Sequence, residues 1–339
     1  MVEYNQQRMN DSSQDTKALI IEALDTMRRG DLVRGEKFSA LAYAKVIKQL
    51  TAFEGPIRTI ADIAALKGVG AKIKLKIEEV ISTGKLESAE RTKRELKMDI
   101  YDALLNIHGV GPVKAKQLVA AGITSIEDLR ARPQLLNDVQ TLGLKYYEDI
   151  LLRIPRSEMR QHETVLTTAL PEKCQGVIVG SYRRKAETSG DIDMLLSYEQ
   201  GTCSATQRDG FRAYIRKLQD QNYILDILAL GDKKCMAVVK LSPNDKARRL
   251  DLLLTPRDEF AYSILYFTGS DSFNVAFRKF AQTKGYTLNE HTLRPVQADR
   301  QEPYFMADEK AIFGFLGLQY VEPEERKGEQ NVKLQAGKS

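Results

Sequence analysis

The strongest constraint on the fold is the segment from Gly180 to Asp193, which lies between two short apolar runs. The runs are Gly-Val-Ile-Val at 176–179 and Met-Leu-Leu at 194–196. Apolar runs interrupted by Gly and Ser predict a strand, a Gly-Ser turn, a basic loop and a second strand. Asp191 and Asp193 lie two residues apart on the second strand. Because strand side chains alternate between faces, both carboxylates are expected to face the same way.

These carboxylates predict a cation site. Two close like charges are unfavourable unless a cation lies between them, and Mg²⁺ prefers carboxylate and phosphate oxygens. A third carboxylate, Asp251, stands alone in the segment 248–254. Two interpretations remain open: Asp251 pairs with Arg249, or strand pairing brings it beside the first two aspartates. Three carboxylates can hold two metal ions about 3.5–4 Å apart, an arrangement suited to in-line displacement at phosphorus.

Hydroxyls, a guanidinium group and turn amides around the aspartates fit a triphosphate, because phosphate sites favour such donors. The expected ligands are Ser181, Arg184, Ser189 and the backbone amides near Gly180 and Gly190. Gly-Ser followed by Asp-x-Asp resembles the nucleotidyltransferase superfamily. That superfamily includes polymerases, tailing enzymes and small-molecule nucleotidyl transferases.

Composition argues against several other classes of protein. No stretch reaches the roughly 20 apolar residues of a membrane span, and the polar N-terminus predicts no signal peptide. Three cysteines and three histidines without metal-ligand spacing argue against a zinc site and indicate thiols in a reducing compartment. We therefore expect an intracellular protein that is not secreted and has no membrane partner. At 339 residues the chain exceeds one ordinary core, so several subdomains are expected.

An internal repeat marks the N-terminal part of the chain. Leu-Lys-Gly-Val-Gly-Ala-Lys at 66–72 and Ile-His-Gly-Val-Gly-Pro-Val-Lys at 107–114 each precede a helical pattern. Glycines allow close backbone approach, and a helix N-terminus offers N–H groups to a phosphate. Each copy resembles a helix-hairpin-helix, a module that grips the DNA backbone without reading bases. The segment 28–97 carries 16 Lys/Arg against 9 Asp/Glu, which favours a polyanion partner.

The chain is expected to be α+β. Up to about Pro155 the pattern is helical, and a strand-rich part follows at 175–256. Helices are expected at 17–27 and 37–52, among others. The apolar runs 235–241 and 247–254 predict a hairpin across Ser-Pro-Asn-Asp-Lys.

Together these motifs resemble the X family of DNA polymerases, of the beta and lambda type. The resemblance covers nearly the whole chain, from about Leu24 to Pro323. Its motifs are the paired hairpins, the segments 180–193 and 248–251, the run 266–274, and Asn-Glu-His-Thr-Leu-Arg-Pro at 289–295.

The resemblance implies four domains. They are a basic helical lyase-like domain with the first hairpin at 1–97, a helical DNA-binding subdomain with the second hairpin at 98–155, a catalytic palm with a nucleotidyltransferase-type sheet at 156–257, and a small α+β nucleotide-selecting subdomain at 258–339. From its charged composition, the tail from about Glu322 is expected to be disordered.

The resemblance also implies roles for individual residues. Asp191, Asp193 and Asp251 match the metal-binding carboxylates, with Asp251 activating the primer 3′-hydroxyl. The positions that match triphosphate contacts are Arg153, Gly180, Ser181, Arg184, Ser189 and Gly190. The positions around the sugar and base are Tyr266, Phe267, Gly269, Asp271 and Asn274. The positions that support DNA and the closed conformation are Lys234, Arg249, Arg278 and Glu290. Tyr266 and Phe267 also fit a helix-end core, and Arg278 and Glu290 also fit surface charges.

For the hairpins, the resemblance implies a monovalent cation, Na⁺ or K⁺, held against a DNA phosphate by backbone carbonyls. The carbonyls concerned are those of Leu66 and Val69 in the first hairpin and of Leu105, Ile107 and Val110 in the second. The hairpin residues expected to contact DNA are Gly68, Gly70, Lys72, Gly109 and Gly111.

A second activity, removal of a 5′-deoxyribose phosphate through a Schiff base, is implied for Lys76. That chemistry needs a lysine with some free amine at neutral pH, and the nearby cations Lys72 and Lys74 favour it. The alternative is a basic helix face that binds only the 5′-phosphate. Glu36 and Ala40 stand where a lysine and a tyrosine bind phosphate in polymerase beta, which weakens the lyase expectation.

Three positions depart from the polymerase beta pattern. Lys185 replaces a glycine, Val275 replaces a lysine beside the template base, and Leu253 replaces an arginine that engages a metal-site carboxylate. We expect fidelity to differ from that of polymerase beta.

The expected function is template-directed gap filling in base excision repair with two Mg²⁺ ions, or Mn²⁺ as a substitute. The expected substrates are dNTP and gapped or nicked DNA with a 5′-phosphate, bound by a monomer in the nucleus of a eukaryote or in a viral setting. One alternative is a template-independent or end-joining nucleotidyltransferase. The short connection 242–246 disfavours it, because such members carry a longer loop there. Another is a DNA-end-binding scaffold with a vestigial active site.

Overall fold

The chain divides into two units. The structure is a computed structural model that describes residues 2–297 and 304–335, with side chains from residue 16 onward. The first unit comprises Met1–Asn106 and Val110–Leu135, and the second comprises Ile107–Gly109 and Leu136–Ser339. Within the described ranges every strand belongs to the second unit. The combination of a helical unit and a mixed unit confirms the expected α+β class. The four domain boundaries stay a prediction.

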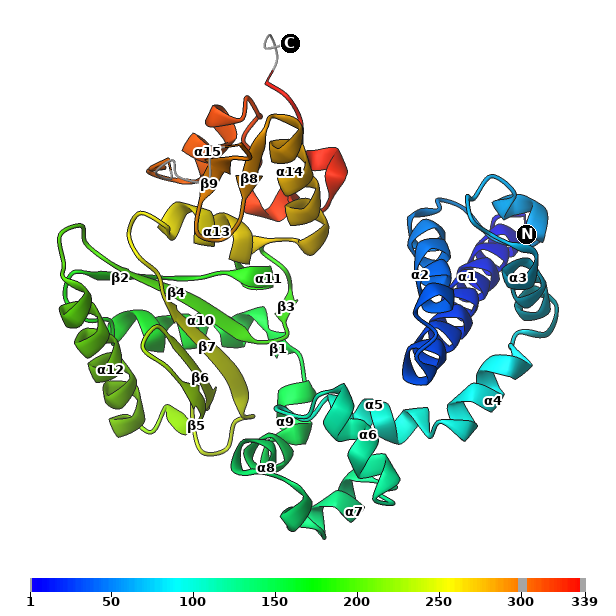
Figure 1. Cartoon of the computed structure of the whole chain (residues 1–339), viewed down its shortest axis with the longest axis horizontal. Helices are drawn as coiled ribbons and strands as arrows, with labels where there is room; N and C mark the ends of the chain where they lie inside the picture. The colour runs from blue at the N-terminus through cyan, green and yellow to red at the C-terminus, as the bar shows by residue number, and fades with distance from the viewer. Residues whose placement is uncertain (1, 298–303, 336–339) are drawn as a thin grey trace. The chain divides into compact units, whose positions relative to one another are not determined.

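The first unit is helical (Figure 1). Its elements are α1 (Val2–Arg34), α2 (Lys37–Ala52), the 3₁₀ turn η1 (Ile60–Ile63), α3 (Ala71–Thr83), α4 (Glu87–Glu95), α5 (Met98–Leu105), α6 (Pro112–Ala120), α7 (Ile126–Arg130) and η2 (Pro133–Leu135). Helix α2 has the bounds that its apolar spacing predicts. Helix α1 is far longer than the expected 17–27, because the polar residues before Lys17 form helix without an apolar stripe to signal it.

Two glycines shape α1. A Cβ at Gly30 would lie 2.5 Å from Thr92 Cγ2, so a residue without a side chain lets α1 lie close to α4. The helix ends before Gly35, whose φ of +88° is a left-handed conformation that favours glycine. The core beneath α1 includes the fully buried Leu24 and Val46.

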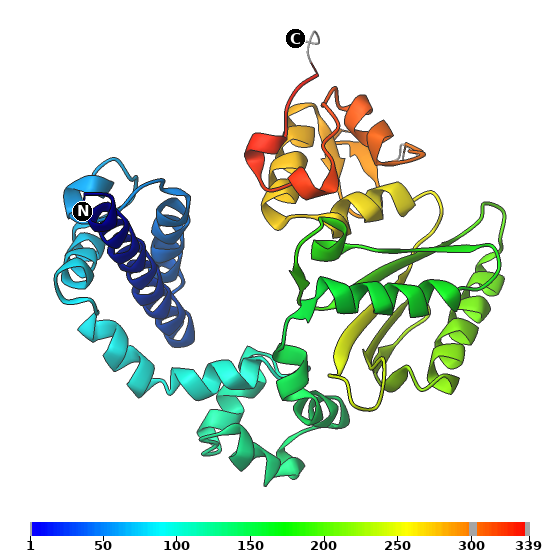
Figure 2. The same ribbon diagram turned by 180° about the vertical axis from the view of Figure 1, so that it is seen from behind.

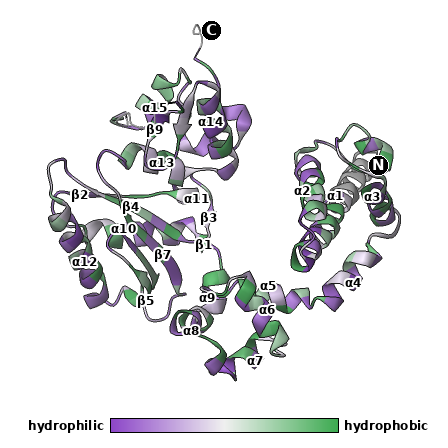
Figure 3. Ribbon diagram, viewed as in Figure 1, coloured by the Kyte–Doolittle hydropathy of each residue, from purple (hydrophilic) through white to green (hydrophobic). Residues whose placement is uncertain are grey.

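The second unit is built on a five-stranded sheet of order β2–β4–β7–β6–β5. The strands are β2 (Cys174–Ile178), β4 (Ile192–Tyr198), β5 (Ile224–Leu230), β6 (Lys234–Val239) and β7 (Arg248–Leu254). Strands β4 and β7 run parallel, and the other neighbours are antiparallel. The β6–β7 pairing confirms the expected hairpin. Figure 3 shows hydrophobic and hydrophilic residues both along these strands and along the helices.

Helices cover both faces of this sheet. On one face, α10 (Arg156–Thr168) and α12 (Ser204–Asp220) form a core with β4 and β7; Figure 2 shows α10 lying across that face. On the other face, α13 (Phe260–Thr268) packs Phe260 against Leu195. Helices α8 (Asp138–Lys145) and α9 (Tyr147–Leu151) cover the far end of this second face, near β5 and β6.

Two short elements differ from the expectation. The Gly-Ser turn at Gly180 is instead a single helical turn, α11 (Gly180–Arg183), entered through the left-handed Gly180 at φ +64°. A two-residue strand, β1 (Ile154–Pro155), pairs with β3 (Thr188–Ser189) where no strand was expected. Both elements are too short to show a period in the sequence.

The C-terminal part comprises α14 (Asp271–Thr283), β8 (Tyr286–Leu288), β9 (Leu293–Pro295), α15 (Glu309–Phe315), η3 (Pro323–Glu325) and η4 (Glu329–Asn331). The expectation of disorder from Glu322 onward is wrong for residues 322–335. Arg326 is fully buried there, and Leu318 and Leu334 form a β-bridge. The charges that suggested disorder are in part paired inside the fold. Residues 336–339 lie outside the described part.

Candidate active site

Strand pairing places two of the three predicted aspartates side by side. Asp193 on β4 lies opposite Asp251 on β7 in the parallel pair, on the sheet face that α13 also covers. Burial, and second the charge of Asp251, raise the pKa of Asp193 to about 6. Two carboxylates this close favour a bound cation, in agreement with the sequence argument.

The third carboxylate, Asp191, is held by an arginine. Asp191 directly precedes β4 and forms an ion pair with Arg249 on β7. The Nε atom of Arg249 also lies 3.7 Å from Oδ1 of Asp251. The structure therefore shows both contacts that were considered for Asp251, one with Arg249 and one with Asp193. In the described ranges, no three Asp, Glu, His or Cys side chains are arranged to hold a metal ion.

The donor set nevertheless fits a divalent cation. Oδ1 of Asp251 is buried and has no hydrogen-bond partner within the described residues, and the same holds for Nε of Arg249. An orphaned carboxylate oxygen beside Asp193 is the hard ligand that Mg²⁺ or Mn²⁺ prefers. Asp191, Asp193 and Asp251 would hold the ions.

A cavity of about 340 Å³ opens next to Asp193. Seven of the residues expected around the nucleotide line it: Gly180, Arg184, Tyr266, Phe267, Gly269, Asp271 and Asn274. Arg278, which was expected to contact DNA, lines it too, and so does Val275, whose side chain is largely exposed. Segments far apart in the sequence thus converge on one polar hollow.

Fixed hydrogen bonds shape this cavity. Arg184 donates to the carbonyl of Thr268 at 2.5 Å, and burial lowers the pKa of its guanidinium. The side-chain amide of Asn274 donates to the carbonyl of Tyr266 at 2.6 Å. The rings of Tyr266 and Phe267 meet edge to face, and Phe267 also packs against the Leu195 core. Phe267 therefore serves the helix-end core as well as the cavity wall.

The other expected triphosphate ligands form a neighbouring cluster and do not line the cavity. Ser181 donates to Ser189 at 3.0 Å. Arg153 donates to the carbonyl of Thr188 at 2.8 Å, and a Cβ at Gly190 would lie 3.4 Å from the Arg153 guanidinium. These hydrogen bonds hold the segment just before β4 in place.

The two hairpins have matching backbones. Gly68 and Gly109 take φ of +83° and +82°, which explains the glycine in each. Gly70 and Gly111 are the extended N-cap residues of α3 and α6. Lys72 is exposed on the first turn of α3.

The turn of the second hairpin packs on α8. The Gln140 side chain donates to the carbonyl of Gly109 at 2.9 Å. A Cβ at Gly143 would lie 2.5 Å from the carbonyl oxygen of His108, so the turn and the helix touch. Burial, and then the charge of Arg249 on β7, lower the pKa of His108. These contacts could not be predicted from the sequence, because they join residues about 30 positions apart.

Helix α8 is in turn fixed to the sheet. Asp226 on β5 accepts a hydrogen bond from the Tyr146 hydroxyl and pairs with Lys145 at 2.9 Å. The pair and the apolar contacts of Leu142 and Ile150 join α8 and α9 to β5 and β6. The position of the hairpin turn relative to Asp251 is therefore set by a continuous set of packed elements.

The remaining predicted residues have simpler surroundings. Lys76 donates to the Ser88 hydroxyl at 3.2 Å. Glu290 lies 3.8 Å from Nε2 of His291, and its carbonyl accepts from Ser263. Lys234 is exposed at the start of β6, opposite Leu253.

A buried charge cluster supports the nucleotide cavity and was also missed. Glu309 receives two hydrogen bonds from Arg183, at 2.6 and 3.1 Å, and one from Arg326. Beside it, the backbone of Arg326 and Lys327 accepts hydrogen bonds from Ser270 and Ser272, next to Gly269 and Asp271.

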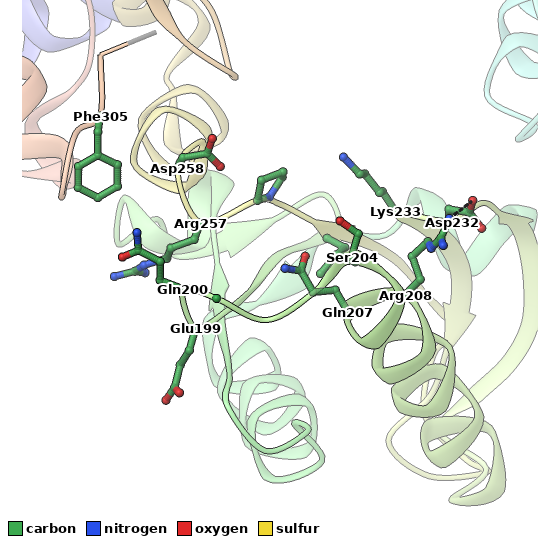
Figure 4. Close-up of a pocket in the computed structure, with 13 residues that line it drawn as sticks. Glu199, Gln200, Ser204, Gln207, Arg208, Asp232, Lys233, Arg257, Asp258 and Phe305 are labelled. Atoms are coloured by element: carbon green, nitrogen blue, oxygen red, sulfur yellow. Dashed lines mark ion pairs between the residues drawn. The ribbon is translucent and has the colours of Figure 1, made fainter. Parts of the chain in front are cut away.

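A larger cavity of about 540 Å³ lies at the ends of β4 and β7, away from the aspartates (Figure 4). Glu199, Arg208, Lys233, Arg257 and Phe305 are among its lining residues. Its acidic and basic groups balance, and Arg208 pairs with Asp232 at 3.8 Å. The residues predicted for chemistry do not line it.

Comparisons with known proteins agree with this geometry. Four family models match consecutive parts of the chain: a helix-hairpin-helix domain at 15–86, the fingers domain of DNA polymerase lambda at 102–151, the DNA polymerase beta palm at 153–257 and the DNA polymerase beta thumb at 263–327. DNA polymerase lambda of Rattus norvegicus is 31% identical over 324 residues. The chain belongs to the X family of DNA polymerases.

Other X-family members are similar over nearly the same span. DNA polymerase lambda of Arabidopsis thaliana is 29% identical over 313 residues, and DNA-directed DNA/RNA polymerase mu of Homo sapiens is 26% identical over 342. The alignments cover 91%, 86% and 90% of this chain for the rat, Arabidopsis and human proteins. They cover 56%, 58% and 68% of those relatives, so the chain spans little more than half of the two lambda polymerases. No helix in the described ranges is long and apolar enough to span a membrane.

Proposed function

We propose that this chain is a template-directed DNA polymerase that fills short gaps during DNA repair. The observation that carries the proposal is the pairing of Asp193 with Asp251 at the edge of a cavity lined by seven predicted nucleotide contacts. Membership of the X family supports the nucleotidyl-transfer reaction proposed for this arrangement. The reaction joins the primer 3′-oxygen to the α-phosphorus of a dNTP and releases pyrophosphate.

Each residue is proposed to have a role that fits its position. When bound, two Mg²⁺ or Mn²⁺ ions would activate the primer hydroxyl and neutralise charge on the triphosphate. Asp191, Asp193 and Asp251 would hold them. Arg184 would bind phosphate oxygens, since a guanidinium matches phosphate geometry. Tyr266, whose carbonyl is fixed by Asn274, would face the sugar and exclude a ribose hydroxyl.

The helical elements are proposed to grip the DNA. Gly68, Gly70, Gly109 and Gly111 would offer backbone N–H groups to DNA phosphates. Na⁺ or K⁺ would lie between phosphate and the backbone carbonyls of Leu66, Val69, Leu105, Ile107 and Val110. We propose gapped or nicked DNA with a 5′-phosphate as the bound form, a monomeric enzyme, and a nuclear location in a eukaryotic cell.

Nucleotide addition on three duplexes tests the proposal. They are a one-nucleotide gap with a 5′-phosphate, the same duplex as an open primer-template, and a blunt end. Addition of the complementary nucleotide, fastest on the gap, is expected. Template-independent addition to the blunt end would favour the end-joining alternative, and tight gap binding without addition would favour the scaffold.

Lys76 is proposed as the nucleophile of a 5′-deoxyribose phosphate lyase. Its position on α3, next to the exposed Lys72 and Lys74, supports this role. Borohydride should trap a covalent adduct on DNA with a 5′-deoxyribose phosphate, and Lys76→Ala should abolish most of it. Equal trapping by Lys72→Ala and Lys76→Ala variants would reject the assignment.

A further inference from the structure

Two adjacent arginines on β7 have very different surroundings. Arg248 is buried and fully satisfied: it donates to both Glu158 oxygens at 2.6 and 2.9 Å and to the carbonyl of Leu152 at 3.0 Å. Arg249 points to the opposite face and pairs with Asp191, while its buried Nε atom lacks a hydrogen-bond partner in the described structure. Arg248 is thus a structural link, and Arg249 is an incompletely satisfied ion pair.

Arg249 engages the same carboxylates that are proposed to bind metal. It pairs with Asp191 and lies 3.7 Å from Oδ1 of Asp251, an oxygen that itself lacks a hydrogen bond. The side chains of Arg249, Asp191 and Asp251 are 32%, 28% and 18% exposed, so water screens these charges only in part. A guanidinium and a divalent cation therefore compete for the negative charge of the same two carboxylates.

A DNA phosphate bound at the second hairpin would be a second partner for Arg249. The turn that carries His108 packs on α8, and α8 and α9 pack against β5 and β6. Burial first, and then the charges of Arg249 and Lys234, lower the pKa of His108. A DNA phosphate gripped by that turn would enter a positive environment next to Arg249. Guanidinium groups bind phosphate in a bidentate manner, which makes phosphate a strong competitor for a partly satisfied arginine.

We propose that Arg249 is a built-in counter-ion that blocks metal binding by the aspartates until a DNA backbone phosphate takes it over. The inference rests on the proposed two-metal function and adds that DNA binds before the metal ions. Leu253, four residues after Arg249 on the same strand face, cannot form an ion pair and so cannot take the place of Arg249 in this role. By linkage, DNA then strengthens metal binding by the same factor by which metal strengthens DNA binding.

Direct measurement of Mn²⁺ binding without dNTP tests the inference. Free Mn²⁺ is quantified by electron paramagnetic resonance for wild type and Arg249→Gln, each with and without one-nucleotide-gapped DNA. Without DNA, the variant should bind Mn²⁺ about tenfold more tightly, the size expected for one charge-assisted pair. Gapped DNA should tighten binding to wild type and have a smaller effect on the variant.

A matched variant separates the ion pair from a general charge effect. Lys234→Gln removes one positive charge from the same neighbourhood without breaking a contact to Asp191, so it should change Mn²⁺ affinity less than Arg249→Gln. Equal effects of the two variants, or equal Mn²⁺ affinities of wild type and Arg249→Gln, would overturn the counter-ion role. Asp251→Asn is also introduced into wild type and into each variant. If it leaves Mn²⁺ binding in the presence of gapped DNA unchanged in every case, the proposed metal site itself is wrong.

Discussion

Replacing Arg326 by alanine should unfold the second unit more easily and weaken nucleotide binding. The side chain is fully buried, pairs with Glu309, and lies within 6 Å of the ring centres of Phe273, Phe313 and Tyr320. Removing one partner of a buried ion pair costs about 3–5 kcal/mol, because the other charge stays buried. Glu309 keeps its second partner, Arg183, so we expect the lower end, about 3 kcal/mol.

Thermal and urea denaturation measure this loss. For a unit of about 200 residues, about 3 kcal/mol corresponds to a fall in Tm of roughly 6–12 °C. The exposed Arg294, which has no ion pair within the described residues, gives the control variant Arg294→Ala, with an expected change below about 0.5 kcal/mol. Equal Tm values for the two variants would refute the buried role of Arg326.

The same substitution has a kinetic consequence. The backbone of Arg326 and Lys327 holds Ser270 and Ser272, which flank the Gly269 and Asp271 walls of the nucleotide cavity. We expect the KM for dNTP to rise several-fold at temperatures where the variant is folded, while affinity for gapped DNA changes little. An unchanged KM would show that the C-terminal segment does not support the cavity.

Three further predictions concern the sheet and the contacts that hold the second hairpin turn on α8. Burial raises the folded-state pKa of Asp193 to about 6, so the metal-free protein should lose about 3 kcal/mol of stability as pH rises from about 4 through 6. Asp193→Asn should remove this pH dependence in urea titrations. Metal binding needs the charged carboxylate, so Mn²⁺ affinity should fall as pH drops through about 6. Gly143→Ala forces a Cβ to within 2.5 Å of the His108 carbonyl and should weaken gapped-DNA binding, measured by fluorescence anisotropy, with the KM for dNTP unchanged. Asp226→Asn, which weakens the contacts with Tyr146 and Lys145, should raise the KM for DNA several-fold with little change in kcat; a pure kcat effect would contradict the anchoring role.

The sequence was most informative where a local period exists. Helix α2 has the bounds that its apolar spacing predicts, and β7 begins one residue later than predicted. Of the two carboxylates predicted from the Asp-x-Asp spacing, strand pairing places Asp193 beside Asp251, while Asp191 precedes β4 and pairs with Arg249. Period-two alternation and helical spacing depend on neighbours within a few residues, so they are readable from one sequence. The two Gly-Val-Gly turns were likewise predicted because the motif repeats, whereas the left-handed φ of Gly68 and Gly109 was not predicted.

Contacts between distant positions could not be read in this way. Arg183 and Glu309 are 126 residues apart, and the charged segment around Arg326 resembled a solvated tail because its ion pairs lie elsewhere in the chain. The pairing of Arg249 with Asp191 rather than only with its strand neighbour also depends on the β4–β7 register. Such pairs become visible only when the strands and helices are placed in space.

Single-nucleotide incorporation by wild type and Asp251→Asn, on a one-nucleotide-gapped duplex with Mg²⁺, tests the central claim most directly. Gel-shift binding of the same duplex serves as the control for folding and DNA contact. The account predicts templated incorporation by wild type, a loss of at least about 10³-fold in the variant, and nearly equal DNA affinity of the two proteins. Incorporation by Asp251→Asn at the wild-type rate would contradict the assignment of Asp251 and the two-metal site built on it.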